Sequence, residues 1–398
     1  MSSVAKRLQP FGTTIFSEMT ALAVKHNAVN LAQGFPDFDG PQLAKDAAKA
    51  AIDAGHSQYA RMFGVPKLNA AIAGAFSKRL ATPVDPDAHI TITSGCTEAL
   101  PATFLGLINP GDEVILFEPF YDSYRACVAL AGAVPRFITL RPDSVGRFGF
   151  DEAELRAAFS DRTRAILINT PHNPTGKVFS RAELELIASL CQKHNVIAVT
   201  DEVYEHLTYE PSLPHISLAS LPGMWERTVT LSSLGKSFSL TGWKIGWAIA
   251  PPNLTAGVRA AHQFLTFATA TPLQHGAAAV IENPCPIVAE YKALFQRNRD
   301  VLATALTRLG FKAFPSDGTY FIMADHSAVS ARLGATDDRD LCQKMIERCG
   351  VAAIPPSVFY ENREHGKPFV RFAYCKKAET IDLAVGRLAA LAKQATLE

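Results

Sequence analysis

Short apolar runs alternate with amphipathic helical patterns from about residue 89 to residue 250, and this alternation most restricts the folds open to the chain. Strands that alternate with helices are typical of βαβ units, which build a largely parallel sheet with helices on both faces. Asp151 with Glu154 and Ser180 with Glu183 have capping-box spacing, so we expect helices to start there. We therefore predict an α/β fold with a seven-stranded main sheet, with strands at His89–Thr93, Glu113–Phe117, Val134–Leu140, Arg164–Asn169, Val196–Thr200, Thr228–Leu231 and Ile245–Ala250.

A second, smaller domain is expected because 398 residues exceed the size of one ordinary compact domain. After residue 253 the pattern is helical to about residue 283, and again from residue 286 to residue 309. The segment before residue 35 shows no sheet pattern of its own. We assign residues 1–35 and 286–398 to a small α+β domain and residues 36–285 to the large domain. Three strands and a closing helix of the small domain are expected at Thr319–Ala324, Val351–Ile354, Phe369–Tyr374 and Thr380–Lys393.

The charge balance argues against binding to nucleic acid or to a membrane surface. The chain has 39 basic and 38 acidic side chains, a net charge of +1, which favours a small-molecule partner. Its seven cysteines form no C-x-x-C pair, so we expect free thiols in a reducing cytoplasm and no metal site. The first residues, MSSVAKRLQPFG, do not have the pattern of a signal peptide, and no run of about 18 apolar residues occurs. We expect a cytoplasmic protein.

The most informative segment is SSLGKSFSLTGWKIGW, residues 232–247, in which a lysine follows the end of a predicted strand. Lys236 would then lie at the carboxyl edge of the sheet, where α/β proteins bind their ligands. A lysine amine condenses with a carbonyl cofactor if burial or a nearby cation keeps the amine neutral. Taken alone, Lys236 is more simply a solvated surface lysine, so its function depends on the residues around it.

Three polar residues near the ends of neighbouring strands suit the ring of such a cofactor. Asp201, in TDEVYEH, could keep a ring nitrogen protonated, although an aspartate there could also be a helix N-cap or a turn residue. Tyr204 and Asn173, the latter in TPHNPTGK, could donate to a phenolate oxygen of the ring. The simpler interpretation of P-H-N-P is a turn bracketed by prolines.

A phosphate group could bind at HITITSGCTEAL, which supplies a strand, a Ser-Gly turn and a helix start. The turn at Gly95 would expose the backbone N–H groups of Cys96 and Thr97 at the first turn of the helix. Ser233 and Lys244 could add donors from the segment around Lys236. A plain strand-to-helix turn is the alternative.

Two further residues complete the candidate site. Tyr121, in FEPFYDSY, could stack on the cofactor ring, or it could be one more aromatic residue of the core. Arg371, in PFVRFAY, is charged inside an apolar strand, where an unpaired guanidinium is costly to bury. Its planar fork suits a substrate α-carboxylate, whereas the alternative is an internal salt bridge with no obvious partner in the sequence.

These segments together resemble the class I, fold-type I aminotransferases that depend on pyridoxal 5'-phosphate (PLP). Within them, the chain is similar to the branch of methionine aminotransferases and kynurenine aminotransferases, the latter also called glutamine transaminase K. The resemblance covers nearly the whole chain, in the ordered segments QPFGTTIFSEMTALA, NLAQGFPDFDGP, SQYARMFGVPKL, SGCTEAL, FEPFYDSY, NTPHNPTGKV, TDEVYEHL, SSLGKSFSLTGWKIGW, GTYF, GVAAIPPSVFY and VRFAYCKK.

The resemblance implies a role for each candidate residue. Lys236 would be the lysine that holds PLP as an imine, Asp201 the partner of the pyridine nitrogen, and Arg371 the ligand of the α-carboxylate. Asn173 and Tyr204 would contact the phenolate, and Ser233 and Lys244 the phosphate. The resemblance also implies a backbone contact from Gly34 to the substrate carboxylate. In a homodimer with shared active sites, Tyr59 would contact the partner's phosphate and Phe267 would line the partner's pocket.

The expected activity is transamination in a ping-pong cycle through the Lys236 aldimine. No second arginine is evident for a side-chain carboxylate, and the expected wall is aromatic, from Phe16, Tyr59, Tyr121, Phe267 and Tyr320. Methionine, glutamine, kynurenine and phenylalanine are therefore the expected donors to a 2-oxo acid. The alternatives are a cysteine-S-conjugate β-lyase and an aminotransferase of another pathway, such as that of N-succinyldiaminopimelate. A non-catalytic sensor is disfavoured by the intact Lys236, Asp201 and Arg371 set, and an NAD enzyme by the lack of G-x-G-x-x-G after a strand.

Overall fold

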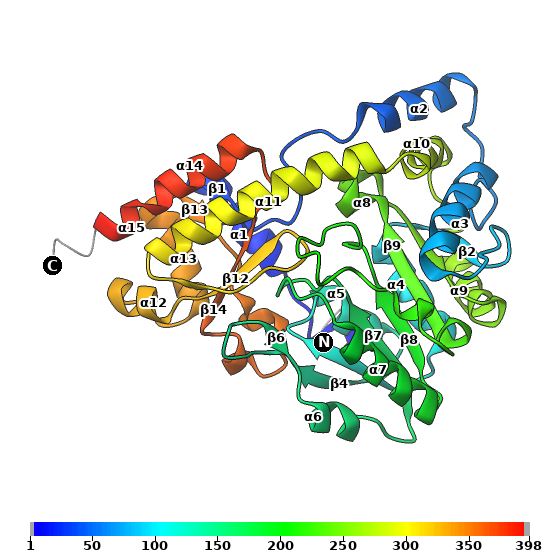
Figure 1. The fold of residues 1–398 in the computed structure, drawn as a ribbon, viewed down its shortest axis with the longest axis horizontal. Helices are drawn as coiled ribbons and strands as arrows, with labels where there is room; N and C mark the ends of the chain where they lie inside the picture. The colour runs from blue at the N-terminus through cyan, green and yellow to red at the C-terminus, as the bar shows by residue number, and fades with distance from the viewer. Residues whose placement is uncertain (1–3, 394–398) are drawn as a thin grey trace.

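A computed structural model describes residues 4–393, and its centre is one mixed sheet of seven strands between helices (Figure 1). Every strand predicted for the main sheet is present, with ends displaced by one or two residues. The sheet is parallel except at β10, which pairs antiparallel with both of its neighbours. The order across the sheet is β2 (Ile90–Ser94), β10 (Ile245–Ile249), β9 (Thr228–Ser233), β8 (Ile197–Asp201), β7 (Thr163–Asn169), β3 (Glu113–Glu118) and β4 (Val134–Thr139).

The two faces of the sheet are covered by different helices because side chains alternate along each strand. On β3, Val114 and Leu116 join the core cluster that includes α4 and α5, whereas Ile115 and Phe117 join the cluster that includes α7. Buried apolar runs on both faces are what the sequence pattern indicated. The helices of this part are α2 (Gln42–Asp53), α3 (Pro66–Leu80), α4 (Cys96–Leu107), α5 (Asp122–Leu130), α6 (Glu152–Ala157), α7 (Arg181–His194), α8 (Leu234–Ser237), α9 (Pro252–Leu265) and α10 (Thr271–Glu282).

The two predicted helix starts are correct, but only one of them is a capping box. Ser180 and Glu183 cap α7 reciprocally. At α6 the Asp151 side chain accepts from the backbone of residues 153 and 154, whereas the Glu154 carboxylate turns away and accepts from Arg141. The helical stretch expected from residue 253 to residue 283 is also divided, because α9 and α10 are separate helices.

The C-terminal part contains a three-stranded antiparallel sheet flanked by helices. β12 (Phe321–Asp325) and β14 (Phe369–Ala373) match two predicted strands, and β11 (Lys312–Ala313) was not predicted. The third predicted strand forms β13 (Val351–Ala352), which pairs with β1 (Val29–Asn30) in a sheet of its own. The closing helix is split into two. The helices are α11 (Cys285–Arg308), α12 (Ser327–Leu333), α13 (Asp338–Cys349), α14 (Ala378–Leu388) and α15 (Ala390–Lys393).

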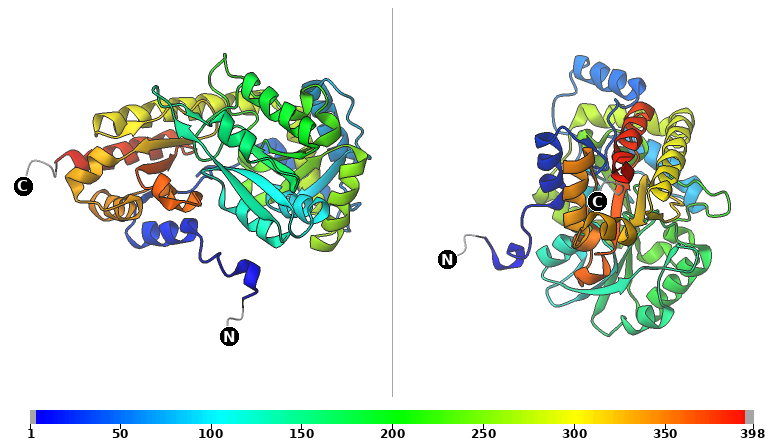
Figure 2. Two further views of the ribbon diagram at one scale, coloured as in Figure 1. Left: turned by 90° about the horizontal axis from the view of Figure 1, so that it is seen from below. Right: turned by 90° about the vertical axis from the view of Figure 1, so that its left-hand side faces the viewer.

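The N-terminal segment carries one strand, β1, contrary to the expectation that it has no sheet pattern. A strand of two residues is too short to show alternation in a sequence. Its pairing with β13 and the packing of α1 (Ile15–Lys25) on β13 and α13 join this segment to the C-terminal part (Figure 2). The division into two domains, with its boundaries, stays a prediction. No helix within residues 4–393 is long and apolar enough to cross a membrane.

Candidate active site

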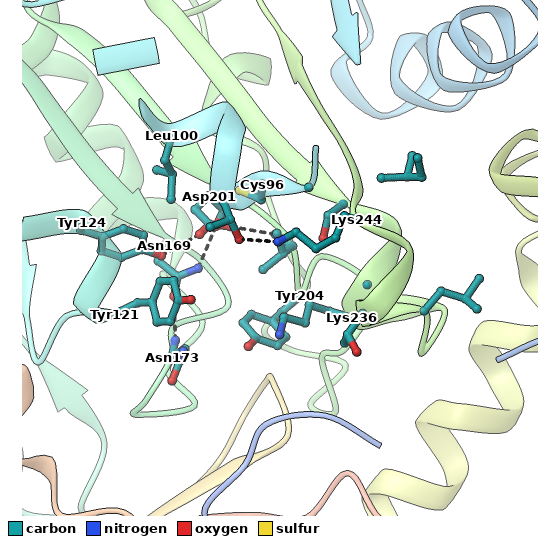
Figure 3. A pocket seen from close by; sticks show the side chains of 18 residues that line it. Cys96, Leu100, Tyr121, Tyr124, Asn169, Asn173, Asp201, Tyr204, Lys236 and Lys244 are labelled. Atoms are coloured by element: carbon teal, nitrogen blue, oxygen red, sulfur yellow. Dashed lines mark hydrogen bonds between the residues drawn. The ribbon is translucent and has the colours of Figure 1, made fainter. Parts of the chain in front are cut away.

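One cavity collects most of the predicted site residues at the carboxyl edge of the main sheet (Figure 3). Asn169 ends β7, Asp201 ends β8 and Ser233 ends β9, and Asn169 and Asp201 are direct partners in the sheet. Parallel strands therefore deliver their last residues to one place. Ten predicted residues line the cavity: Gly95, Cys96, Thr97, Tyr121, Asn173, Asp201, Tyr204, Ser233, Lys236 and Lys244.

Lys236 lies on α8, a single helical turn that follows β9 directly. Its Nζ is 3.5 Å from the carbonyl oxygen of Gly34 and 6.0 Å from the centre of the Tyr204 ring. Burial lowers the pKa of the Lys236 ammonium, and the negative charge of Asp201 opposes this effect only in part. More of the amine is therefore neutral at a given pH than for a lysine in water, as a nucleophile requires.

Asp201 is a buried carboxylate held by neutral donors. The Tyr124 hydroxyl donates to Oδ2 at 2.7 Å and the backbone N–H of Val203 donates to Oδ1 at 3.2 Å. Burial raises the pKa of Asp201, and among residues 4–393 this carboxylate forms no ion pair. A buried carboxylate without a cation favours a positively charged ligand.

Tyr124 was missed by the sequence reasoning, although one signal for it exists. It lies on α5, three residues after Tyr121, which is the N-cap of that helix. The two rings meet edge to face with their centres 5.6 Å apart. Tyr121 borders the cavity, and burial raises its pKa to about 12.

A chain of amides connects the carboxylate end of the cavity to Arg371. Asn169 Nδ2 donates to the backbone carbonyl of Asp201 at 2.9 Å, and its Oδ1 accepts the backbone N–H of Asn173 at 2.7 Å. The Asn173 Oδ1 in turn accepts from Arg371 Nη1 at 3.0 Å. Because that oxygen is engaged, the amide nitrogen is the end of Asn173 that can donate to a ligand.

Arg371 is buried without a carboxylate. Its Nη2 donates to the carbonyl of Ala32 at 2.8 Å, whereas Nε has no partner in the described part of the chain. The guanidinium lies over the rings of Phe321 and Phe16, at 4.2 and 5.3 Å from their centres. Burial lowers the pKa of Arg371 to about 10. Among residues 4–393 the internal salt bridge considered from the sequence is not found, so the guanidinium can bind an external carboxylate.

Gly34 and Tyr320 form the wall between Lys236 and Arg371. The Gly34 carbonyl accepts from Tyr320 Oη at 2.6 Å, and a side chain at Gly34 would place its Cβ 2.6 Å from Phe321 Cζ. Glycine is therefore required there by the close approach of an aromatic ring. The Tyr204 and Tyr320 rings meet edge to face at 5.2 Å, and burial raises the pKa of Tyr204.

The opposite end of the cavity is a strand-to-helix turn with a lysine beside it. Gly95 has φ +70°, α4 begins at Cys96, and Lys244 Nζ donates to Thr97 Oγ1 at 3.0 Å. A Cβ at Gly95 would lie 3.2 Å from Lys244 Nζ, so the glycine leaves room around the ammonium. Free N–H groups, a cation and a hydroxyl together suit a phosphate group.

Five predicted residues do not line this cavity: Phe16, Gly34, Tyr59, Phe267 and Arg371. Tyr59 and Phe267 are 85% and 45% exposed, and their rings meet edge to face at 5.5 Å. Phe264, three residues before Phe267, is also exposed. In a single chain these aromatic residues therefore do not wall the site, and their predicted place in the pocket of a partner subunit stays a prediction.

Comparison with known proteins gives a consistent result along the whole chain. The family model described as "Aminotransferase class I and II" matches residues 26–388. The chain belongs to this aminotransferase family. The solved structure of N-succinyldiaminopimelate aminotransferase from Mycobacterium tuberculosis has a TM-score of 0.94 and 44% identity, over 98% of this chain and 100% of that one.

Two further relatives match the branch that the sequence resembles. Human kynurenine--oxoglutarate transaminase 1 is 39% identical over 95% of each chain. The solved structure of YbdL from Escherichia coli, described as a methionine aminotransferase, has a TM-score of 0.92 and 38% identity, over 98% of this chain and 99% of that one. The predicted fold and enzyme class are therefore confirmed, and this aminotransferase is PLP-dependent, like its family.

The cavity fits PLP on three features of its own. The carboxylate of Asp201, which lacks a cation, would hold the protonated ring nitrogen. The amine of Lys236, with its lowered pKa, would meet the aldehyde. The turn at Gly95, with Thr97 and Lys244, would hold the phosphate.

Proposed function

We propose that this aminotransferase moves the amino group of a neutral or aromatic L-amino acid to a 2-oxo acid in a ping-pong cycle. The observation that supports this most is the charge of the site. Arg371 offers one unpaired guanidinium nitrogen for an α-carboxylate, and the side chains whose rings lie over its guanidinium, Phe16, Phe321 and Phe359, carry no charge. A distal carboxylate of the donor that packed against these rings would be buried without a partner.

The chemistry is divided between the cofactor and the chain. When bound, PLP supplies an electrophilic carbon for the amino group and a protonated ring that withdraws electrons from the substrate Cα. With the cofactor and substrate bound, the free amine of Lys236 would move the Cα proton as a general base, a role that its lowered pKa supports. The same cycle in reverse serves the 2-oxo acid.

Orientation of the substrate falls to Arg371 and its neighbours. Its planar fork would bind the carboxylate, while Asn173 Oδ1 and the Ala32 carbonyl hold the guanidinium plane in place. Phe16 and Phe321 exclude water from the ion pair, since both rings lie over the guanidinium. A fixed carboxylate also fixes which Cα bond faces Lys236.

We expect a donor panel to separate neutral from acidic amino acids. Methionine, glutamine, phenylalanine and kynurenine should have kcat/KM values at least about 100-fold above that of aspartate, because a buried unpaired carboxylate costs several kcal/mol. Steady-state kinetics with two 2-oxo acids as acceptors measures this. Aspartate as the best donor would contradict the proposed pocket.

Two alternatives are decided by the same assay. N-succinyldiaminopimelate is the donor named for the Mycobacterium tuberculosis relative, and it carries carboxylates beyond the one that Arg371 would bind. A kcat/KM for this donor above those of the neutral amino acids would replace the proposal. A cysteine conjugate with a good leaving group tests the β-lyase alternative, because release of pyruvate reports elimination.

We further propose a two-fold homodimer in which Tyr59 and Phe267 enter the partner's site. Exposed aromatic side chains at one surface are typical of an interface, and an isologous contact would serve both sites at once. Sedimentation should show a dimer. Tyr59→Ala should weaken PLP binding about tenfold while the unfolding temperature of the apoenzyme stays nearly unchanged. A fully active monomer would exclude this arrangement.

A further inference from the structure

A buried acid–base pair lies behind the phosphate turn and takes no part in the chemistry described above. His262 of α9 is 0% exposed, and Glu98 of α4 is 8% exposed. The His262 Nδ1 and Glu98 Oε1 atoms are 2.6 Å apart. α4 and α9 pack against each other along their length, so the pair joins two helices of the large domain (Figure 1).

Each member of the pair holds a different loop. The second oxygen of Glu98 accepts the backbone N–H of Ser94, the residue before the turn at Gly95. The second nitrogen of His262 is 2.8 Å from the carbonyl oxygen of Met62. Met62 stands three residues after Tyr59, so the pair spans from the phosphate turn to the segment that bears Tyr59.

The hydrogen-bond directions define the protonation of the ring. A backbone carbonyl can only accept, so Nε2 donates to Met62, and Nδ1 donates to the Glu98 carboxylate. The carboxylate and the carbonyl raise the pKa of His262 although burial opposes them. The His262 ring therefore faces the Glu98 carboxyl group in the first turn of α4, next to a site for an anionic phosphate.

The segment around Tyr59 is held by α10 at two further points. Thr271 Oγ1 donates to the carbonyl of Gln58 at 2.8 Å. Gln274, which is fully buried, accepts the backbone N–H of Val65 at 2.8 Å and donates to the carbonyl of Thr269 at 2.9 Å. His262 is the contact in this set that also reaches the phosphate turn, through Glu98.

We propose that the Glu98–His262 pair is a positioning pair that fixes the phosphate turn of its own site and the Tyr59 segment relative to each other. One pair would then act on two sites, because the proposed dimer sends Tyr59 to the partner. The claim that the pair acts on a second site rests on that proposed dimer. The claim that the pair fixes the phosphate turn relative to the Tyr59 segment concerns a single chain.

The first test compares PLP with pyridoxal, which lacks the phosphate. In apoenzyme titrations followed by absorbance, His262→Ala should weaken PLP binding about tenfold or more and change pyridoxal binding less than about twofold. Glu98→Ala should give the same pattern. An equal loss for both ligands, or no loss for PLP, would overturn the proposal.

Two control variants separate positioning from general destabilisation. Glu98→Gln should have a Kd for PLP within about twofold of that of the parent enzyme. The glutamine oxygen can accept from the backbone N–H of Ser94, and its nitrogen can donate to Nδ1 of a neutral His262, whose Nε2 still donates to Met62. His326→Ala removes another buried histidine, bonded to Ser330 in the small domain, and should lower the unfolding temperature with an unchanged preference for PLP over pyridoxal. A loss of that preference in His326→Ala would mean that the effect is not local.

The second test uses mixed dimers. One subunit carries both Lys236→Ala and His262→Ala, and its partner is unchanged. Only the site of the unchanged subunit can then hold PLP as an imine. That site has its own intact phosphate turn but receives Tyr59 from the altered subunit. PLP should bind this site several-fold more weakly than in a control dimer with Lys236→Ala alone. Equal affinities would overturn the coupling between sites. Sedimentation distinguishes failure of the dimer proposal from failure of the positioning pair, because a monomer forms no mixed dimers. The comparison of PLP with pyridoxal tests the pair in a monomer as well.

Discussion

Replacing Lys236 with alanine is expected to lower transamination by about 10⁴-fold or more and to end covalent attachment of PLP to the chain. The amine is buried beside Asp201 and Gly34, its pKa is lowered, and methyl cannot replace it as nucleophile or as general base. Borohydride reduction followed by peptide mass analysis measures the attachment. Stopped-flow turnover with methionine measures the loss in rate.

A second lysine in the cavity offers the matched control for this variant. Lys244 contacts Thr97 at the phosphate end, so Lys244→Ala should weaken PLP binding but leave the reducible covalent link at Lys236. A borohydride-fixed cofactor in Lys236→Ala, attached to Lys244 or to any other lysine, would show that the nucleophile has been assigned wrongly.

The sequence predicted these two lysines, and Asp201, because chain order alone places them at one sheet edge. Lys236 and Asp201 follow apolar strands of the βαβ pattern, and parallel strands present their carboxyl ends together. Lys244 precedes β10 and reaches the same edge because β10 runs antiparallel to its neighbours. The pairing of Asn169 with Asp201 follows from the same topology. The local sequence pattern was therefore enough to predict the residues that the order and direction of the strands bring to the site.

Residues that depend on side-chain contacts across the fold were beyond this reasoning. Tyr124 donates to a carboxylate 77 positions away, and His262 meets Glu98 across 164 positions. Neither contact follows from periodicity. The sequence can show which face of a helix is buried, but it does not show which side-chain atom that face contacts. Tyr59 and Phe267 were predicted to enter the site of a partner subunit, and in the single chain both side chains are exposed.

Short elements form a third class. β1 has two residues, too few to show alternation, whereas the strand predicted at Val351–Ile354 forms β13 only over Val351–Ala352. The pairing of these two strands accompanies packing by α1 and α13. The capping box predicted at Asp151 fails for a related reason. The Glu154 carboxylate accepts a hydrogen bond from Arg141, a residue outside the helix, and this bond replaces the one to the N-cap backbone that a capping box requires.

Changing Asp201 to asparagine is expected to lower kcat/KM for methionine by about 10²- to 10³-fold, while the unfolding temperature of the apoenzyme changes little. The amide keeps the shape of the side chain and can still accept from Tyr124 or Val203. It loses the negative charge, and the ring nitrogen then has no counter-ion in a buried site. The electron demand at the substrate Cα weakens accordingly.

Tyr124→Phe separates the charge of Asp201 from its orientation. This variant removes the donor at 2.7 Å and leaves the carboxylate, so the loss in kcat/KM should stay within about tenfold, the scale of one hydrogen bond to a charged group. The lost donor also lowered the pKa of Asp201, so that pKa should rise further in the apoenzyme. Near-normal turnover in Asp201→Asn would refute the counter-ion role. A loss in Tyr124→Phe as large as that in Asp201→Asn would instead mean that orientation of the carboxylate, and not its charge, limits the rate.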